Sequence, residues 1–249
     1  MKGTTKVITA TEFKKNLGSY IDFVADNNAV VVTKNGRKTL RLTPYITEVE
    51  QYSLLKENAL DYQYGGKKVS YEEFMEIYEN SNLRMEYING EIVLLSSPST
   101  FHQDISGNLY VKLRDYLLGE ECKVFYAPFD VHFFKHEIDT PDVMQPDLLI
   151  ACDLEGNINE KDKYMGTPTL CVEILSKSTR SRDMVDKLNT YMTSGVKEFW
   201  VVDPKKRTVL IYAFKDLEIE EYSTYKENEA LSSYYFKGLQ IPLAEIFAR

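Results

Sequence analysis

The apolar stretch TLCVEIL, residues 169–175, carries one charged residue, a glutamate. Its length and composition predict a buried strand, and the rest of the fold can be inferred outward from it. Because side chains alternate along a strand, Glu173 shares one face with Cys171 and Leu175. A carboxylate inside so apolar a strand costs free energy unless it is paired or binds a metal ion. Glu173 is therefore the first candidate for a chemical role.

A second carboxylate lies near the start of another apolar stretch, PDLLIA at residues 146–151. If the two strands are neighbours, Asp147 and Glu173 can converge on one hard cation, since Mg²⁺ prefers oxygen ligands. Alternatively, Asp147 follows a proline and only caps a turn at the start of a strand. Lys187 lies four residues after Asp183 on a predicted helix. It is either a site residue or the partner of Asp183 on a solvated face.

Apolar residues recur at helical or strand spacing through residues 99–247. The order of elements is typical of an α/β (α+β) fold, with a mixed sheet and a helix on either side. In chain order the patterns predict a helix from Ser99 or Thr100 with Ile105, Leu109, Leu113 and Leu117 buried, strands over 124–134, 146–151 and 169–175, a helix over 181–194 ended by Gly195, strands over 198–203 and 208–214, and a strand and short helix within 234–247.

A capping box of Ser70 and Glu73 predicts a helix that runs through Tyr78. A hairpin follows, with strands over 85–88 and 91–95 joined at Asn89-Gly90. Residues 46–68 are polar and rich in tyrosine, and we interpret them as a linker with a short helix around 54–60. The domain that contains Asp147 and Glu173 is therefore expected over residues 69–249.

Residues 1–45 predict a small α+β domain. Val7-Ile8 is a strand, and Thr9 or Thr11 caps one helix that continues to Asn27-Asn28. The segments AVVVT and KTLRL flank Asn35-Gly36, a dipeptide typical of a two-residue hairpin turn. A domain of this size has a small core, so we expect it to dimerise or to dock on another surface.

Charge and composition limit the classes of protein to consider. The chain has 249 residues and a formal net charge of -8, which argues against a general nucleic-acid coat protein. Residues 1–50 hold eight basic and five acidic side chains, so the acidic excess lies in the rest of the chain. A basic N-terminal segment, here called the head, followed by an acidic remainder suggests two modules with different partners.

Cysteine usage and hydropathy predict a compartment. Cys122, Cys152 and Cys171 are far apart and odd in number, which favours a reduced, cytoplasmic protein with free thiols. No stretch approaches the ~20 apolar residues that cross a bilayer, so no membrane partner is expected. Glycine-rich phosphate loops, a Gly-x-Ser-x-Gly elbow and zinc-ligand spacing are absent from the sequence. Any chemistry therefore depends on carboxylates.

Four segments together resemble the PD-(D/E)XK nuclease superfamily, and within it the restriction-endonuclease-like branch called Uma-two. The resemblance covers about residues 70–215 and implies a restriction-endonuclease-like mixed sheet flanked by helices. It also implies that Asp147 and Glu173 bind Mg²⁺ or Mn²⁺, with the carbonyl of Ile174 as a further ligand. The segments are LRMEYINGEIVLLSSPSTFHQ, QPDLLIA, CVEILSKSTRSRDMVDKLNTYMTSGVKEFWVVDP and TVLIY.

The same resemblance implies a catalytic lysine, with one departure. The superfamily places it two residues after the metal-binding glutamate, where this chain has Leu175. In the Uma-two branch the lysine comes from the following helix, where Lys187 matches and Lys177 is the second candidate. His102 and Glu86 match polar positions of the branch and would complete the catalytic set. Alternatively, His102 only caps or packs its helix, and Glu86 is solvated beside its turn.

The head has a resemblance of its own, carried by ITATEFKKNLGSYIDFVADNNAVVVTKNGRKTLRLTPY. Over about residues 5–45 it is similar to the Phd/YefM antitoxin family, whose domains dimerise and present their N-terminal parts to operator DNA. The alternative is a module that only dimerises. The residues that would contact DNA are Thr9, Thr11, Lys14, Lys15 and Arg37.

Together these patterns suggest a cytoplasmic, two-module protein. The hypothesis is a Mg²⁺- or Mn²⁺-dependent endonuclease that hydrolyses DNA, tethered to an antitoxin-like DNA-binding and dimerisation head. Its expected partners are DNA, a second copy of the chain and a toxin. One alternative is a non-catalytic DNA-binding regulator that keeps a degenerate nuclease fold. The other is an antitoxin whose acidic body neutralises a basic toxin.

Overall fold

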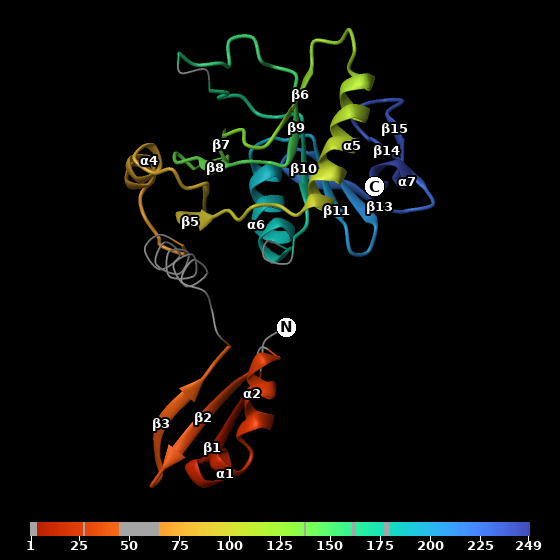
Figure 1. Cartoon of the computed structure of the whole chain (residues 1–249). Helices are drawn as coiled ribbons and strands as arrows, with labels where there is room; N and C mark the ends of the chain where they lie inside the picture. Colours follow the sequence, from red (N-terminus) through yellow and green to blue (C-terminus); the bar gives the residue numbers. More distant parts are fainter. Residues whose placement is uncertain (1–3, 27, 45–64, 137, 161–162, 177–179) are drawn as a thin grey trace. The chain divides into compact units, whose positions relative to one another are not determined.

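The computed structural model describes residues 4–26, 28–44, 65–136, 138–160, 163–176 and 180–249, with the backbone alone for 180–184. Contacts divide the chain into two compact units, residues 1–60 and 61–249, and each is described by itself (Figure 1). The predicted helix around 54–60 and most of the predicted linker over 46–68 lie outside the described residues. The domain bounds inferred from the sequence therefore stay predictions.

The N-terminal unit contains a three-stranded sheet with two short helices. Asn35 and Gly36 both have positive φ, 51° and 75°, as the predicted hairpin turn requires. Its buried core consists of Ile8, Val24, Val30 and Val32. Its elements are β1 (Thr5–Thr9), α1 (Ala10–Lys15), α2 (Leu17–Ala25), β2 (Ala29–Lys34) and β3 (Arg37–Leu42), and β1 is parallel to β2 while β3 is antiparallel to it.

One predicted feature of this unit is wrong. The single helix is two helices, because Asn16 leaves the helical conformation at φ -124° and ψ 32°. Asparagine competes with helical hydrogen bonding and favours helix ends, which fits this break. Of the two predicted caps, Thr9 begins α1, since its hydroxyl accepts a hydrogen bond of 3.2 Å from the backbone N–H of Glu12.

A mixed six-stranded sheet forms the centre of the C-terminal unit, in the order β13-β12-β11-β10-β9-β6. Only β10 and β11 are parallel among its neighbouring pairs, and the other pairs are antiparallel. This confirms the predicted mixed sheet. The strands are β6 (Lys123–Tyr126), β9 (Leu148–Ala151), β10 (Leu170–Ile174), β11 (Glu198–Asp203), β12 (Thr208–Lys215) and β13 (Glu218–Lys226).

Two helices pack on this sheet in separate apolar clusters. The helix α5 (Thr100–Tyr116) contributes Ile105, Leu109 and Leu113 to the cluster that contains the even-numbered residues of β10. The helix α6 (Arg180–Thr193) contributes Tyr191 to the cluster that contains Cys171 and Leu175. The predicted alternation along β10 is therefore confirmed, and Glu173 faces α6. Among the described residues, no helix is long and apolar enough to cross a membrane.

A second sheet contains the hairpin that carries Glu86. Its order is β5-β4-β8-β7, and α4 buries Phe74 against Met85 and Ile92. The strands are β4 (Met85–Ile88), β5 (Glu91–Leu94), β7 (Val131–Phe133) and β8 (Asp142–Met144), and the helix is α4 (Tyr71–Glu79). The C-terminal part adds β14 (Ala230–Ser232), β15 (Gln240–Pro242) and α7 (Leu243–Ile246).

The strand predicted over 124–134 is also wrong, because it is two strands in different sheets. Pro128 follows β6 and cannot donate a ladder hydrogen bond, so the chain leaves one sheet there and joins the other as β7. The strands β8, β13 and β14 were not predicted. The side chains of β13, EIEEYSTYK, are mostly exposed and include three glutamates and a lysine, as suits a strand at a sheet edge.

The prediction of three free thiols is wrong for two of them. Cys122 and Cys152 form a disulfide, with their Cα atoms 4.0 Å apart. They are 30 residues apart in sequence, but β6 and β9 pair with Lys123 opposite Ala151, so the two cysteines face each other one position further on. Cys171 is free and buried, as expected.

A buried carboxylate, Glu198, fixes the C-terminal segment to the central sheet. It is 0% exposed and accepts hydrogen bonds from Trp200 Nε1 at 2.7 Å and Ser233 Oγ at 2.6 Å. The backbone N–H groups of Tyr234 and Tyr235 donate to it at 3.3 and 3.1 Å. Each oxygen therefore has two donors, which offsets the cost of burying the charge.

We expect Glu198→Gln to lower the free energy of unfolding by about 2 kcal/mol, because an amide nitrogen would then face buried donors. Urea unfolding followed by the fluorescence of Trp200, the single tryptophan of the chain, measures this unit. Glu218→Gln removes the same charge from the exposed start of β13 and serves as the control, with an expected change within about 0.5 kcal/mol. Equal midpoints for both variants would contradict the role given to Glu198.

Candidate active site

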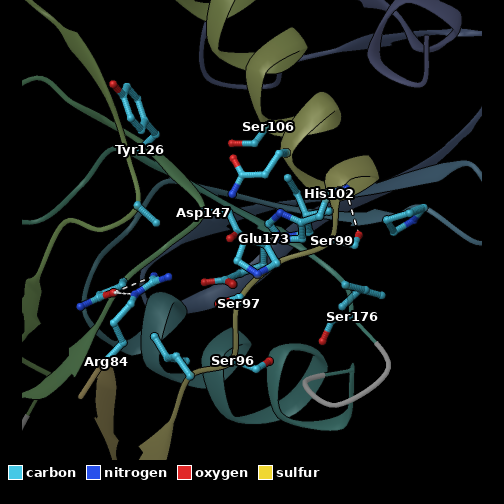
Figure 2. A pocket seen from close by; sticks show the side chains of 18 of the residues that line it. Arg84, Ser96, Ser97, Ser99, His102, Ser106, Tyr126, Asp147, Glu173 and Ser176 are labelled. Carbon is cyan, nitrogen blue, oxygen red and sulfur yellow. Dashed lines mark hydrogen bonds and ion pairs between the residues drawn. The ribbon is translucent and has the colours of Figure 1, made fainter. Parts of the chain in front are cut away.

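A pocket of about 810 Å³ opens beside the ends of β9 and β10 (Figure 2). It lies between the hairpin of β4 and β5, the first turns of α5 and the loop after β11. Asp147, Glu173 and His102 lie close together in it, and Arg84 lies apart from them. The lining includes Arg84, Glu86, Ser97, Ser99, His102, Tyr126, Gln145, Asp147, Glu173, Ile174, Ser176, Lys187, Lys205 and Lys206.

Asp147 immediately precedes β9, and Glu173 lies on β10, the neighbouring strand, as predicted. The strands β9 and β10 are antiparallel with Leu148 opposite Val172, which brings the two carboxylates to adjacent positions at one end of the pair. The backbone N–H of Ile174 donates to Asp147 Oδ2 at 2.7 Å. Asp147 therefore does more than cap a turn, because its carboxylate accepts a hydrogen bond from the backbone of β10.

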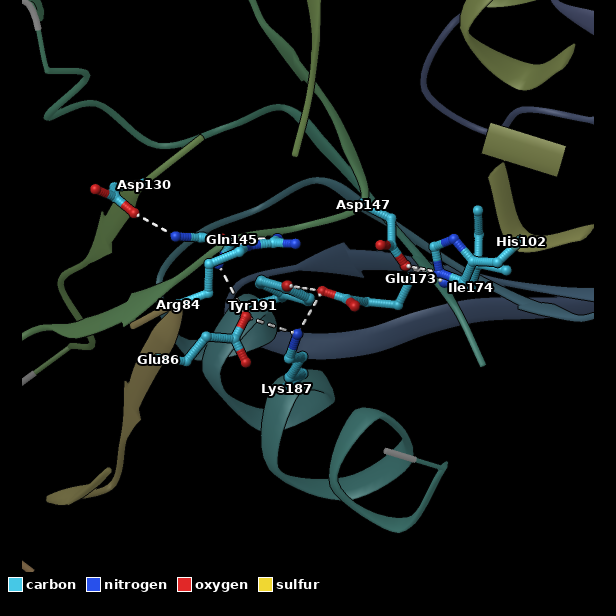
Figure 3. Close-up of polar contacts among 10 residues, drawn as sticks. All are labelled: Arg84, Glu86, His102, Asp130, Gln145, Asp147, Glu173, Ile174, Lys187 and Tyr191. Atoms are coloured by element: carbon cyan, nitrogen blue, oxygen red, sulfur yellow. Dashed lines mark hydrogen bonds and ion pairs between the residues drawn. The ribbon is translucent and has the colours of Figure 1, made fainter. Parts of the chain in front are cut away.

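His102 lies within the first turn of α5, where Ser99 caps the helix by accepting a hydrogen bond from its backbone N–H at 3.2 Å. Its Nε2 atom is 3.2 Å from Asp147 Oδ2. Both side chains are largely buried, at 13% and 20% exposure. The cap thus fixes the helix end that places the imidazole against Asp147 (Figure 3).

Lys187 joins two carboxylates. Its Nζ atom is 2.9 Å from Glu173 Oε1 and 3.0 Å from Glu86 Oε1. All three side chains are at most 5% exposed. The alternatives of a solvated Lys187 and a solvated Glu86 are therefore wrong: α6 turns Lys187 inward, and β4 turns Glu86 toward it. Lys177 and the side chain of Asp183 lie outside the described residues.

Tyr191, which the sequence analysis missed, completes this group. It lies one helical turn after Lys187, and its hydroxyl donates to Glu173 Oε1 at 2.5 Å. Burial, and then the negative charge of Glu173, hold the pKa of Tyr191 well above its ordinary value. The hydroxyl therefore stays protonated and keeps donating. The i, i+4 spacing from Lys187 was the available signal for it.

Gln145 is a second residue that was missed. Its backbone N–H donates to Glu86 Oε1 at 2.9 Å, and its Nε2 donates to Asp130 Oδ1 at 2.8 Å. Its Oε1 accepts a hydrogen bond from Arg84 Nη2 at 3.0 Å. Tyr78 donates to the same Asp130 carboxylate at 2.7 and 2.8 Å. Gln145 therefore connects the pocket to α4.

The acids of the site are not all paired with a lysine. Lys187 pairs with Glu86 and Glu173, whereas Asp147 contacts His102; Arg84, Lys205 and Lys206 also line the pocket. No group of three or more His, Cys, Asp or Glu side chains with metal-holding geometry occurs in the described part of the chain. The donor set is instead two carboxylates, with the backbone of Ile174 beside them. Oxygen donors of this kind fit Mg²⁺ or Mn²⁺.

The five candidate residues of the head are exposed in the N-terminal unit. Thr9 uses its hydroxyl to cap α1. Thr11, Lys14 and Lys15 lie on α1, and Arg37 begins β3 after the hairpin turn. Their contact with DNA stays a prediction.

Two family profiles match the chain. The Uma2 profile, described as "Putative restriction endonuclease", matches residues 71–244. The profile "Antitoxin Phd_YefM, type II toxin-antitoxin system" matches residues 5–63. Both matches agree with the resemblances found in the sequence.

Two known proteins are similar to most of the chain. An uncharacterized protein of Synechocystis sp. is 24% identical over 179 residues, which are 72% of this chain and 86% of that protein. The crystal structure of "a putative nuclease belonging to DUF820" from Anabaena variabilis superposes with a TM-score of 0.58. It is 17% identical and covers 72% of this chain and 97% of its own, so it shows a shared fold.

Proposed function

The chain belongs to the Uma2 family, and from the geometry of its pocket we propose that it is a metal-dependent endonuclease that hydrolyses phosphodiester bonds in DNA. One observation carries the proposal. Asp147 and Glu173 occupy adjacent positions at one end of the β9–β10 pair, and Lys187 Nζ donates a hydrogen bond to Glu173 Oε1 at 2.9 Å. Two carboxylates and a lysine in one pocket form the set that the nuclease resemblance implies.

Each site residue has a separate task in this proposal. Asp147 and Glu173 would hold the metal ion, with the carbonyl of Ile174 as a further ligand. A bound Mg²⁺ or Mn²⁺ supplies a water of lowered pKa and stabilises negative charge on the phosphate. His102 orients the Asp147 carboxylate through their 3.2 Å contact. Tyr191 orients Glu173 in the same way, through its short hydrogen bond.

Lys187 would orient the attacking water or stabilise charge on the phosphate. The position two residues after Glu173 is Leu175, which is 7% exposed and packs in the apolar cluster beneath α6. Lys187 of α6 would therefore supply the catalytic lysine that the superfamily pattern places at position 175. Glu86 is a second acceptor for the Nζ of Lys187 at 3.0 Å, so the ammonium group has a fixed location.

The N-terminal unit would bring the endonuclease to DNA. Residues 5–63 match the antitoxin profile, and we propose that this head dimerises and contacts DNA through Thr9, Thr11, Lys14, Lys15 and Arg37. A toxin is a further proposed partner, because the matched family belongs to toxin-antitoxin systems.

The experiment that tests the function is cleavage of supercoiled plasmid and of single-stranded DNA by the full chain. We expect nicked or linear products with Mg²⁺ or Mn²⁺ and none with EDTA, because two carboxylates alone supply no Lewis acid. Mn²⁺ binding, followed by electron paramagnetic resonance without DNA, gives an independent readout of the site.

The second candidate is a non-catalytic DNA-binding regulator, which the antitoxin match and the apolar Leu175 favour. It predicts a folded protein that binds DNA, cleaves neither substrate with either metal ion, and takes up no Mn²⁺. That combined result would replace the endonuclease proposal.

A further inference from the structure

Arg84 lines the pocket but has no role in the steps above. It immediately precedes β4 and is exposed. Glu86 follows two residues later, so the two side chains leave the strand on the same side. Figures 2 and 3 both show Arg84 apart from Asp147 and His102, across the pocket. Its charge therefore acts on a different part of any bound molecule.

The guanidinium group is held in place by a neutral acceptor. Nη2 and Nε of Arg84 lie 3.0 and 3.4 Å from Gln145 Oε1. The amide cannot turn around freely, because its Nε2 donates to Asp130 at 2.8 Å. Gln145 is 7% exposed, so this support is itself buried. The hydrogen bonds to Gln145 therefore set the orientation of Arg84.

The guanidinium of Arg84 is not paired with a described acid. Among the described residues it forms no ion pair, whereas Lys187 is balanced by Glu86 and Glu173. A side-chain amide orients a guanidinium and leaves its positive charge, whereas a carboxylate would offset that charge. The donors that Gln145 does not use can face the pocket. A planar guanidinium with paired N–H donors suits the oxygens of a phosphate group.

We propose that Arg84 binds a phosphodiester group of the DNA strand in the pocket, next to the one that is cleaved, and that Gln145 is its positioning residue. The inference rests on the proposed function, since it takes DNA as the occupant. Arg84 would contact a phosphate of the DNA backbone and no base, so the contact contributes to affinity without sequence preference. Because this phosphate does not react, the contact is equally strong before and during the chemical step, and it affects KM more than kcat.

The test is binding of a short labelled DNA duplex to the full chain in EDTA, by fluorescence anisotropy at several salt concentrations. Lys14→Ala and Lys15→Ala are present throughout to reduce binding by the head. Arg84→Ala should weaken binding about tenfold and make the slope of log affinity against log salt shallower by about 0.9. Arg84→Lys should keep the slope and lose part of the affinity, because the charge stays but the fork is lost.

Arg114→Ala is the matched control, since Arg114 is exposed on α5 and does not line the pocket. It should leave both affinity and slope unchanged. Unfolding followed by Trp200 checks that each variant is folded. In the cleavage assay, Arg84→Ala should raise KM about tenfold with little change in kcat.

The outcomes separate this inference from the proposed function. If DNA binding depends on Arg84 but the wild type never cleaves, the endonuclease proposal fails and the phosphate contact stands. If the wild type cleaves while Arg84→Ala keeps its affinity, salt slope and KM, the contact is wrong and the endonuclease stands. Absence of DNA binding by the chain with the altered head would also overturn the contact.

Discussion

Asp147→Asn is expected to lower the rate of metal-dependent cleavage about a thousandfold or more, which corresponds to about 4 kcal/mol of transition-state stabilisation. Asparagine has the same shape and still accepts the hydrogen bond that the Ile174 N–H donates to Asp147 at 2.7 Å. The charge that would hold the metal ion is lost. The measurement is single-turnover cleavage of plasmid DNA at saturating Mg²⁺, together with Mn²⁺ titration of the variant.

A matched control distinguishes the metal site from a general loss of charge. Asp104→Asn changes an exposed carboxylate on α5, the helix that carries His102, and should cleave like the wild type. Cleavage by Asp147→Asn at the wild-type rate would show that the observed nicking comes from another site or from a contaminant. Unchanged Mn²⁺ affinity in this variant would contradict the role of Asp147 as a ligand.

Lys187→Met is expected to abolish cleavage and to lower the free energy of unfolding of the C-terminal unit by about 3–5 kcal/mol. Methionine fills much of the space but leaves Glu86 and Glu173 buried without their shared cation. Breaking a buried ion pair from one side costs more than exchanging the whole pair, because a charge remains unpaired in the interior. Urea unfolding followed by Trp200 fluorescence measures the loss.

A double variant tests this explanation. Adding Glu86→Gln to Lys187→Met removes one of the two unpaired charges, so part of the lost stability should return while cleavage stays absent. Additive losses would mean that Lys187 and Glu86 do not interact as described. Cleavage that survives Lys187→Met would remove the lysine of α6 from the mechanism and leave Lys177 as the candidate to test.

Local patterns were sufficient to predict several elements. The Asn89-Gly90 turn has the positive φ values, 51° and 83°, that its hairpin needs, and Ser70 and Ser99 cap the helices that follow them. The helix α5 buries the stripe that its spacing predicted. These features depend on residues a few positions apart, so a single sequence reveals them.

Features that depend on distant partners could not be predicted in the same way. The break after β6 needs a second sheet to receive β7, and the strand β13 is stabilised by pairing with β12 although its own side chains are mostly exposed. The disulfide needs the register of β6 against β9, which no local pattern contains. Each of these is a tertiary constraint that overrides local preference.

The candidate site shows the same division. Glu173 was found because a charge in an apolar strand demands a partner, and Asp147 because it starts the neighbouring strand. The partners themselves were only partly foreseen: Lys187 came from the resemblance, while Tyr191 and Gln145 were missed. Tyrosine on a helix and glutamine before a proline are ordinary residues in sequence. Only their contacts in the folded chain, of Tyr191 with Glu173 and of Gln145 with Glu86, give them a role.

The ion pairs of Lys187 have a consequence for synthesis of the chain on the ribosome. Lys187 is separated from Glu86 by 101 residues and from Glu173 by 14. Synthesis proceeds from the N-terminus, so both carboxylates and Asp147 leave the exit tunnel before the lysine does. The strand β11, which pairs with β10, follows later still. A polypeptide that ends before Lys187 therefore carries the carboxylates of the site without the lysine that pairs with two of them, and the proposed cutting activity requires translation past Lys187 and β11.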